Sequence, residues 1–161
     1  MKKFIFIGLT LLPLMVQAEA LKPPETGGAS PRSQIWLTSG FISYHFQTDQ
    51  HLRNNNAGIG LEYRYTANGA IATGRFNNSD WQTTHYMAWQ YQPITLGVVR
   101  FGAAIGLFDG YPKVNNSGWF AAVIPTISMD YQSLGANLAV VPTYHNKLHG
   151  ALSLQLKLKL Y

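Results

Sequence analysis

Residues 151–161 read Ala-Leu-Ser-Leu-Gln-Leu-Lys-Leu-Lys-Leu-Tyr, so that a leucine stands at every second position from 152 to 160. The residues between the leucines are small, polar or charged. Because successive side chains of a β-strand point to opposite faces of the sheet, this period of two predicts a strand with one apolar and one polar face. We therefore expect the chain to end in a strand that separates two different environments.

The same alternation recurs through the chain and predicts eight strands, at about 35–46, 57–66, 70–77, 84–91, 96–107, 119–129, 135–141 and 150–160. The predicted connections alternate in length. Short turns are expected at 66–69, 92–95 and 130–133, and longer polar segments at 47–56, 78–83, 109–118 and 142–149. An even number of strands, with short turns at one end and long loops at the other, is typical of an outer-membrane β-barrel. The predicted fold is an all-β, eight-stranded antiparallel up-and-down transmembrane barrel.

The two faces of these strands have different partners in the two architectures that fit the pattern. In a membrane barrel the apolar face meets lipid, and the polar face lines a narrow interior where glycine fits well. In a soluble barrel or sandwich the apolar face is the core and the charges lie outside. The membrane barrel predicts that five charged side chains point inward: Glu62, Arg64, Arg75, Arg100 and Lys157.

The composition excludes several functional classes. The 161 residues hold 12 Lys and Arg, 7 Asp and Glu, and no cysteine, which excludes disulfides, cysteine-bound zinc and a thiol nucleophile. The basic residues are scattered singly and no glycine-rich phosphate loop is present, so we predict no nucleic-acid partner. The five histidines are spread over separate segments, and His145 with His149 is only a weak pair, so we predict no metal and no other cofactor.

The first residues have the features of an export signal. Lys2 and Lys3 precede the apolar run 4–16, and small residues follow at 16–18, which predicts a secretory signal peptide over 1–18. A cut after Ala20 is equally acceptable. Residues 19–34, which contain three prolines, are expected to form an irregular periplasmic lead-in, and 35–161 the barrel in the bacterial outer membrane.

Two prolines fall in or beside the predicted sixth and seventh strands, at Pro125 and Pro142. Proline has no N–H to donate, so two prolines on neighbouring strands predict a gap in the hydrogen bonding of the sheet. The alternative is that Pro142 merely ends a strand while Pro125 marks a bulge.

The spacing of Pro125, Ser128, Tyr131 and Pro142 resembles the penultimate region of the PagP family, the outer-membrane lipid A palmitoyltransferases. Other parts of the chain are similar to further elements of that family: Thr143, Tyr144 and Asn146; Phe76-Asn-Asn-Ser79; and Gly58-Ile-Gly-Leu61. The resemblance implies a monomeric enzyme that moves an acyl chain from a phospholipid to lipid A or a related outer-leaflet lipid. It also implies that Pro125 and Pro142 frame a lateral path for lipid into the barrel.

The resemblance also implies candidate site residues. Ser79 and Asn78 stand at the positions of the family's serine and aspartate, and His45 is the nearest substitute for its histidine, because Ser39 stands at that position. Four inward residues would line the acyl slot: Gly102, Ala104, Gly106 and Ser128. Asn78 in place of aspartate, and a lead-in too short for the family's amphipathic helix, leave an alternative open. That alternative is a non-catalytic outer-membrane barrel of the adhesion or stress-resistance type, acting through its extracellular loops.

Overall fold

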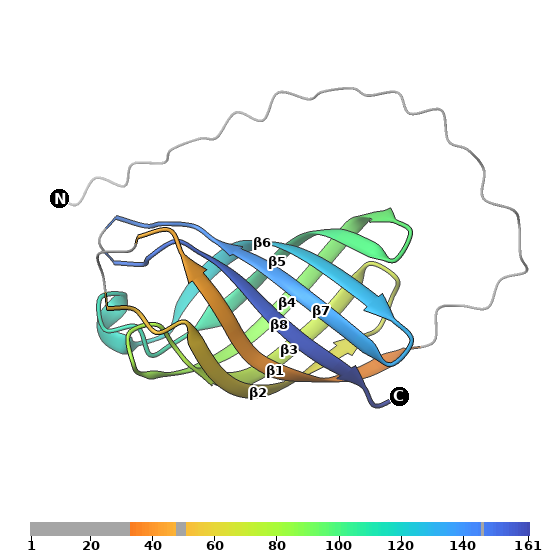
Figure 1. Cartoon of the computed structure of the whole chain (residues 1–161), viewed down its shortest axis with the longest axis horizontal. Coiled ribbons are helices and arrows are strands. Elements are labelled where there is room, and N and C mark those ends of the chain that lie inside the picture. The colour runs from red at the N-terminus through yellow and green to blue at the C-terminus, as the bar shows by residue number, and fades with distance from the viewer. Residues whose placement is uncertain (1–32, 48–50, 146) are drawn as a thin grey trace, which may run out of the picture.

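The computed structural model describes residues 33–47, 51–145 and 147–161, so the predicted signal peptide and most of the lead-in lie outside the described residues. It has eight strands: β1 (Gln34–His45), β2 (Asn55–Arg64), β3 (Gly69–Asn77), β4 (Thr83–Leu96), β5 (Val99–Phe108), β6 (Phe120–Tyr131), β7 (Leu134–Val141) and β8 (Ala151–Lys159). Each strand pairs antiparallel with the next, and β1 pairs with β8, which closes the barrel (Figure 1). The predicted eight-stranded antiparallel barrel is confirmed.

The two ends of the barrel differ as predicted. Short turns join β2 to β3, β4 to β5 and β6 to β7, and the C-terminus lies at the same end, which we call the short-turn end (Figure 1). The opposite, long-loop end carries the other four connections, one of which contains the 3-10 turn η1 (Asn115–Ser117). The turn predicted at 92–95 is wrong, because β4 continues to Leu96 through a bulge between Tyr91 and Ile94. The chain reverses instead at Gly97, whose positive φ of 60° suits glycine.

A second bulge decides which side chains of β1 enter the barrel. The register of β1 with β2 shifts between Ser39 and Phe41. Before the shift Trp36 and Thr38 are buried, and after it Ser43 and His45 are buried, so that the inward positions change from even to odd numbers. A bulge inserts one residue and re-aims the side chains that follow it. His45 therefore points into the barrel, whereas Ser39 is exposed outside it.

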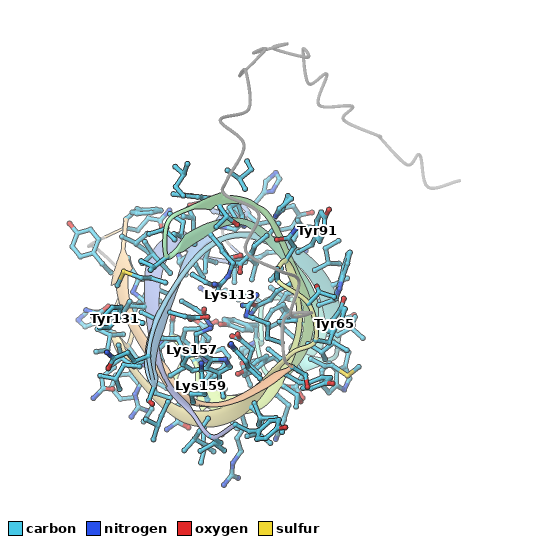
Figure 2. The ribbon with its side chains drawn as sticks, turned by 90° about the vertical axis from the view of Figure 1, so that its right-hand side faces the viewer. Tyr65, Tyr91, Lys113, Tyr131, Lys157 and Lys159 are labelled. Atoms are coloured by element: carbon cyan, nitrogen blue, oxygen red, sulfur yellow. The ribbon has the colours of Figure 1, made fainter. Side chains whose placement is uncertain are left out.

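The faces of the strands are sorted as the membrane-barrel pattern predicts, with one exception. Glu62, Arg64 and Lys157 are buried inside, whereas leucine, isoleucine and tyrosine side chains cover the outer surface (Figure 2). Arg75 was predicted inside and is exposed outside, because β3 turns its even-numbered residues inward, Phe76 among them. No helix formed by the described residues has the length and hydropathy needed to cross a membrane.

The interior near the short-turn end is filled by an ion network that we call the charged cluster: Glu62, Arg64, Arg100, Asp130 and Lys157. Lys157 Nζ lies 2.7 Å from Glu62 Oε1 and 2.9 Å from Asp130 Oδ1. Arg64 pairs with Glu62 at 3.0 Å, and Arg100 pairs with Asp130. Each of these charges therefore has an opposite partner at a place where water has little access, and the cluster keeps one surplus positive charge.

Above the charged cluster lies a layer of neutral polar side chains, the polar layer: Gln92, Ser128, Asn137 and Gln155. Asn137 Nδ2 donates to Glu62 Oε2 at 2.9 Å and to Gln155 Oε1 at 3.2 Å, while Asn137 Oδ1 accepts from the Ser128 hydroxyl at 2.7 Å. The polar layer therefore joins the charged cluster to the middle of the barrel.

The ladder between β6 and β7 stops halfway along the barrel. Its last pair is Thr126 with Ala139, whereas β5 continues to pair with β6 as far as Phe120 and β7 continues to pair with β8 as far as Val141. Among the described residues, Phe120–Pro125 of β6 thus have no partner on β7. The gap predicted between these strands is present in the half that faces the long loops.

Candidate active site

Two loops and the end of β1 bring three polar side chains together at the long-loop end. His45 is the last residue of β1 and is 7% exposed, Ser79 follows β3, and Asn54 precedes β2. His45 Nε2 lies 2.8 Å from Ser79 Oγ, and His45 Nδ1 lies 2.8 Å from Asn54 Oδ1. The pair predicted from the sequence, His45 and Ser79, is in direct hydrogen-bond contact.

The partners of His45 determine the direction of these hydrogen bonds. An amide oxygen only accepts, so Nδ1 must carry the proton that is donated to Asn54. In the neutral ring Nε2 is then an acceptor, and the Ser79 hydroxyl donates to it. This is the arrangement of a hydroxyl nucleophile, a general base and a third group that orients the base.

Asn78 holds the turn that presents Ser79. Its side chain is fully buried, and Oδ1 accepts from the backbone N–H groups of Asp80 and Gln82, both at 3.0 Å. Its Nδ2 donates to Thr84 Oγ1 at 3.0 Å and to the Gly110 carbonyl at 2.7 Å. Because these bonds occupy both ends of the amide, the geometry gives Asn78 a positioning role for Ser79. A catalytic role for Asn78 stays a prediction.

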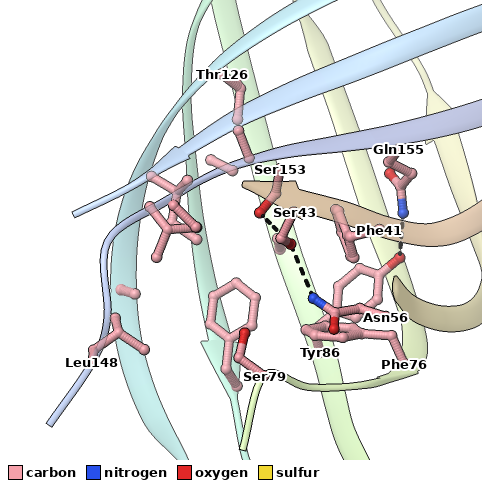
Figure 3. Close-up of a pocket in the computed structure, with 18 of the residues that line it drawn as sticks. Phe41, Ser43, Asn56, Phe76, Ser79, Tyr86, Thr126, Leu148, Ser153 and Gln155 are labelled. Carbon is pink, nitrogen blue, oxygen red and sulfur yellow. Dashed lines mark hydrogen bonds between the residues drawn. The ribbon is translucent and has the colours of Figure 1, made fainter. Parts of the chain in front are cut away.

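An apolar cavity lies directly beneath this pair inside the barrel (Figure 3). Its empty space is about 1180 Å³, counting its opening to solvent. His45 and Ser79 belong to its lining, and Asn137 and Gln155 of the polar layer form its floor. Its apolar wall includes Phe41, Phe76, Phe108, Phe120, Ile124 and Val141. A polar pair therefore stands at the mouth of a largely apolar compartment.

The four residues predicted to line the acyl slot differ in their position relative to the cavity. Ala104 lines the cavity. Ser128 does not, because it is fully buried in the polar layer and hydrogen-bonds to Gln92 and Asn137. Gly106 is closed off by its neighbours, since a Cβ added there would lie 2.9 Å from Ala88 and Phe108, and Gly102 packs against the backbone of Tyr91. Gly102, Gly106 and Ser128 are thus not among the residues that line this cavity, and their role in an acyl slot stays a prediction.

The cavity reaches the barrel wall at the gap between β6 and β7. Ala122 and Ile124 line it from β6, and Ala139, Val141 and Pro142 line it from the other side. Pro125 stands at the first position of β6 that has no partner on β7, with its ring on the exposed outer face. Both prolines singled out in the sequence therefore border this gap.

Two further residues of the site were missed by the sequence reasoning. Asn54 lies within a run of three asparagines, and no pattern distinguishes the one that contacts His45. Tyr111 lines the cavity from the loop after β5. Burial, and secondarily the carboxylate of Asp80, raise the pKa of the Tyr111 phenol above its ordinary value. Tyr111 is therefore a neutral hydroxyl at the mouth of the cavity.

Within the parts of the chain that the structure describes, no group of three or more His, Asp or Glu side chains is placed to hold a metal ion. No family model and no curated protein sequence matches the chain.

Proposed function

We propose that this protein is an outer-membrane acyltransferase that moves an acyl chain from a phospholipid to lipid A or a related outer-leaflet lipid. One observation carries the proposal: the 2.8 Å hydrogen bond between His45 and Ser79 lies at the mouth of an apolar cavity inside the barrel. An ester with a long alkyl chain has the matching structure, because its reactive carbonyl is polar and its tail is apolar.

The outer surface supports a membrane location. Leu152, Leu154, Leu156 and Leu158 stand exposed along β8, and such an apolar surface favours contact with lipid over contact with water. Aromatic side chains gather near the short-turn end, where Trp89 Nε1 donates to the Tyr65 hydroxyl at 2.7 Å. A belt of tyrosine and tryptophan is typical of the membrane interface.

The gap between β6 and β7 supports a route for the alkyl chain. Elsewhere in the wall a chain entering from the side would have to break ladder hydrogen bonds, whereas Phe120–Pro125 have no such bonds to β7 among the described residues. The gap borders the cavity at Ile124 and Val141. In this proposal the tail enters sideways between Pro125 and Pro142, and the ester carbonyl stops at Ser79.

The chemistry proceeds in two balanced steps. The Ser79 oxygen bonds to the carbonyl carbon while its proton passes to His45 Nε2, and the ester C–O bond then breaks as the departing alcohol takes that proton. An acceptor hydroxyl next gives its proton to His45 and attacks the Ser79 ester. The new ester forms as the Ser79 oxygen recovers the proton. Asn54 keeps Nδ1 protonated in both steps.

Mass spectrometry of lipid A tests this function. Cells that express the wild-type chain should contain lipid A with one additional acyl group, and this product should disappear with Ser79→Ala and with His45→Ala. Ser133→Ala is the matched control, because Ser133 is exposed in the turn between β6 and β7 at the opposite end. Unchanged lipid A in cells expressing the folded wild-type barrel would refute the proposal and favour the non-catalytic alternative.

A further inference from the structure

Ser79 borders a second cavity on the side away from the apolar compartment. This outer cleft has an empty space of about 640 Å³, counting its opening to solvent. Its walls include Ser79, Asp80, Trp81, Lys113, His51 and His149. Ser79, Asp80 and His149 line both cavities, so the two spaces meet at the nucleophile.

This placement determines where the rest of a bound ester must lie. If the alkyl chain fills the apolar cavity and the carbonyl rests at Ser79, the alcohol part of the ester projects into the outer cleft. We infer that the outer cleft binds a phosphate-bearing lipid head group, with Lys113 and His149 as its ligands. The inference rests on the proposed function, because that function places the carbonyl at Ser79.

The charges around the outer cleft match an anionic group. Lys113 is exposed on the loop after β5, and in the view along the barrel axis it falls inside the outline of the barrel (Figure 2). The Arg53 guanidinium lies 5.2 Å from the ring centre of Trp81, which forms part of the wall. Asp80 supplies one negative charge, so these side chains leave a surplus of one positive charge, which a phosphate group would compensate.

His149 adds a polar atom without a partner. Its Nε2 is inaccessible to solvent and has no hydrogen-bond partner among the described residues. A buried polar atom in that state gains from a ligand atom that completes its hydrogen bond. Because His149 lines both cavities, a rotation of its ring would expose Nε2 to a phosphate oxygen close to the ester group.

Binding of uncleavable single-chain lipids tests the inference separately from catalysis. We would use the full mature chain carrying Ser79→Ala, held in amphipol, and titrate hexadecylphosphoglycerol, hexadecyl phosphate and the phosphate-free hexadecylglycerol. We expect the phosphate lipids to bind about tenfold more tightly than hexadecylglycerol, as a charge-assisted contact to Lys113 would produce. A preference for the diester identifies the phospholipid donor as the source of the head group, and a preference for the monoester identifies a phosphorylated sugar.

Lys113→Gln and His149→Phe should each reduce or abolish the preference for phosphate, measured as the ratio of the Kd of hexadecylglycerol to the Kd of each phosphate lipid. The ratio is used because His149 also lines the apolar cavity, so that an effect of His149→Phe on the alkyl chain is common to all three lipids. Lys147→Gln is the matched control, because Lys147 is an exposed lysine of the long-loop end that lines neither cavity. Equal binding of all three lipids to the starting protein, or a preference that survives Lys113→Gln, overturns the inference. Failure of the proposed function has a different signature: the lipids bind, but the protein with Ser79 intact transfers no acyl chain.

Discussion

Near the short turns, three basic and two acidic side chains meet inside the barrel, and the fully buried Lys157 bridges Glu62 and Asp130. Near the long loops, the same eight strands surround an empty space of about 1180 Å³, counting its opening to solvent. The inward positions of that half carry six alanines that line the space: Ala72, Ala88, Ala104, Ala122, Ala139 and Ala151. Because of the size of the inward side chains, the short-turn half of the barrel is thus filled and the long-loop half is hollow, although the wall is continuous.

The two halves of the barrel are expected to contribute differently: the charged cluster to stability, and the hollow half to the binding of a ligand. Charges inside the narrow barrel are held only because each has an opposite partner, so the charged cluster tolerates few changes. The hollow half forgoes packing between its walls and leaves space for a ligand. Changes to the site should therefore affect activity with little effect on stability, and changes to the charged cluster should have the opposite effect.

The largest effect on activity is expected at His45 and Ser79, which lie at the mouth of the cavity in the hollow half. Ser79→Ala should lower the rate of acyl transfer by about a thousandfold or more, because among the described residues Ser79 carries the hydroxyl that is hydrogen-bonded to His45. Tryptophan-fluorescence unfolding in urea, with the barrel in lipid vesicles, should show an unchanged midpoint. A parallel loss of stability would show that the two halves are not independent.

The next largest effect is expected in the charged cluster. Glu62→Leu leaves Lys157 and Arg64 with only Asp130 as an anionic partner, and should lower the free energy of unfolding by about 3–5 kcal/mol. The same urea titration measures it. A variant as stable as the wild type would mean that water reaches these charges and that the short-turn half is not tightly filled.

A smaller effect on activity is expected at Asn54, which contacts His45 without reaching the cavity. Asn54→Ala should lower kcat by about tenfold or more with KM nearly unchanged, because the His45 ring loses the acceptor that holds its Nδ1 proton. Asn54→Asp keeps an acceptor oxygen and should restore activity. Equal rates for wild type and Asn54→Ala would remove Asn54 from the site.

A substitution at Ala104 tests whether the cavity determines the length of the acyl chain. Ala104→Met adds volume to the cavity wall and should shift the transferred acyl group to a shorter chain by a few methylene groups, since the longer side chain would occupy space that the alkyl chain fills. Ala103→Met is the control, because the neighbouring side chain of β5 points to the outer face. Mass spectrometry of the lipid product reads the length. An unchanged product spectrum for Ala104→Met contradicts the assignment of the cavity to the acyl chain.

The smallest effect on stability is expected on the outer surface of the barrel. Arg75 is exposed on the outer face of β3, and no salt bridge to it is found among the described side chains. Arg75→Gln should change the free energy of unfolding by less than about 1 kcal/mol. A change as large as that of Glu62→Leu would show that Arg75 takes part in the ion network after all.

Much of this arrangement follows from the alternation of residues alone. A period of two predicted the eight strands, the inward direction of Glu62, Arg64 and Lys157, and the different lengths of the connections at the two ends. In an up-and-down barrel the ends of the first and third strands lie at the same rim. The family resemblance singled out His45 and Ser79, and this topology explains why the two side chains lie close together.

Other features depend on contacts between strands, which a single sequence does not display. The bulge in β1 sets the direction of His45, because one inserted residue reverses the faces of the side chains that follow it. The bulge in β4 lets that strand continue past 92–95, so that the chain turns at Gly97 instead. Packing between neighbours covered Gly106 and left Ala104 open. The choice of Asn54 among three asparagines was likewise settled by where the loop after β1 returns.

The local pattern of this chain determined that it forms a two-faced β-sheet with polar residues inside, because side-chain direction in a strand depends only on position along it. Only closure of the barrel decided where that interior is full and where it is empty. Closure sets which inward side chains from eight separate strands meet at the same height, and that register is a property of the whole sheet.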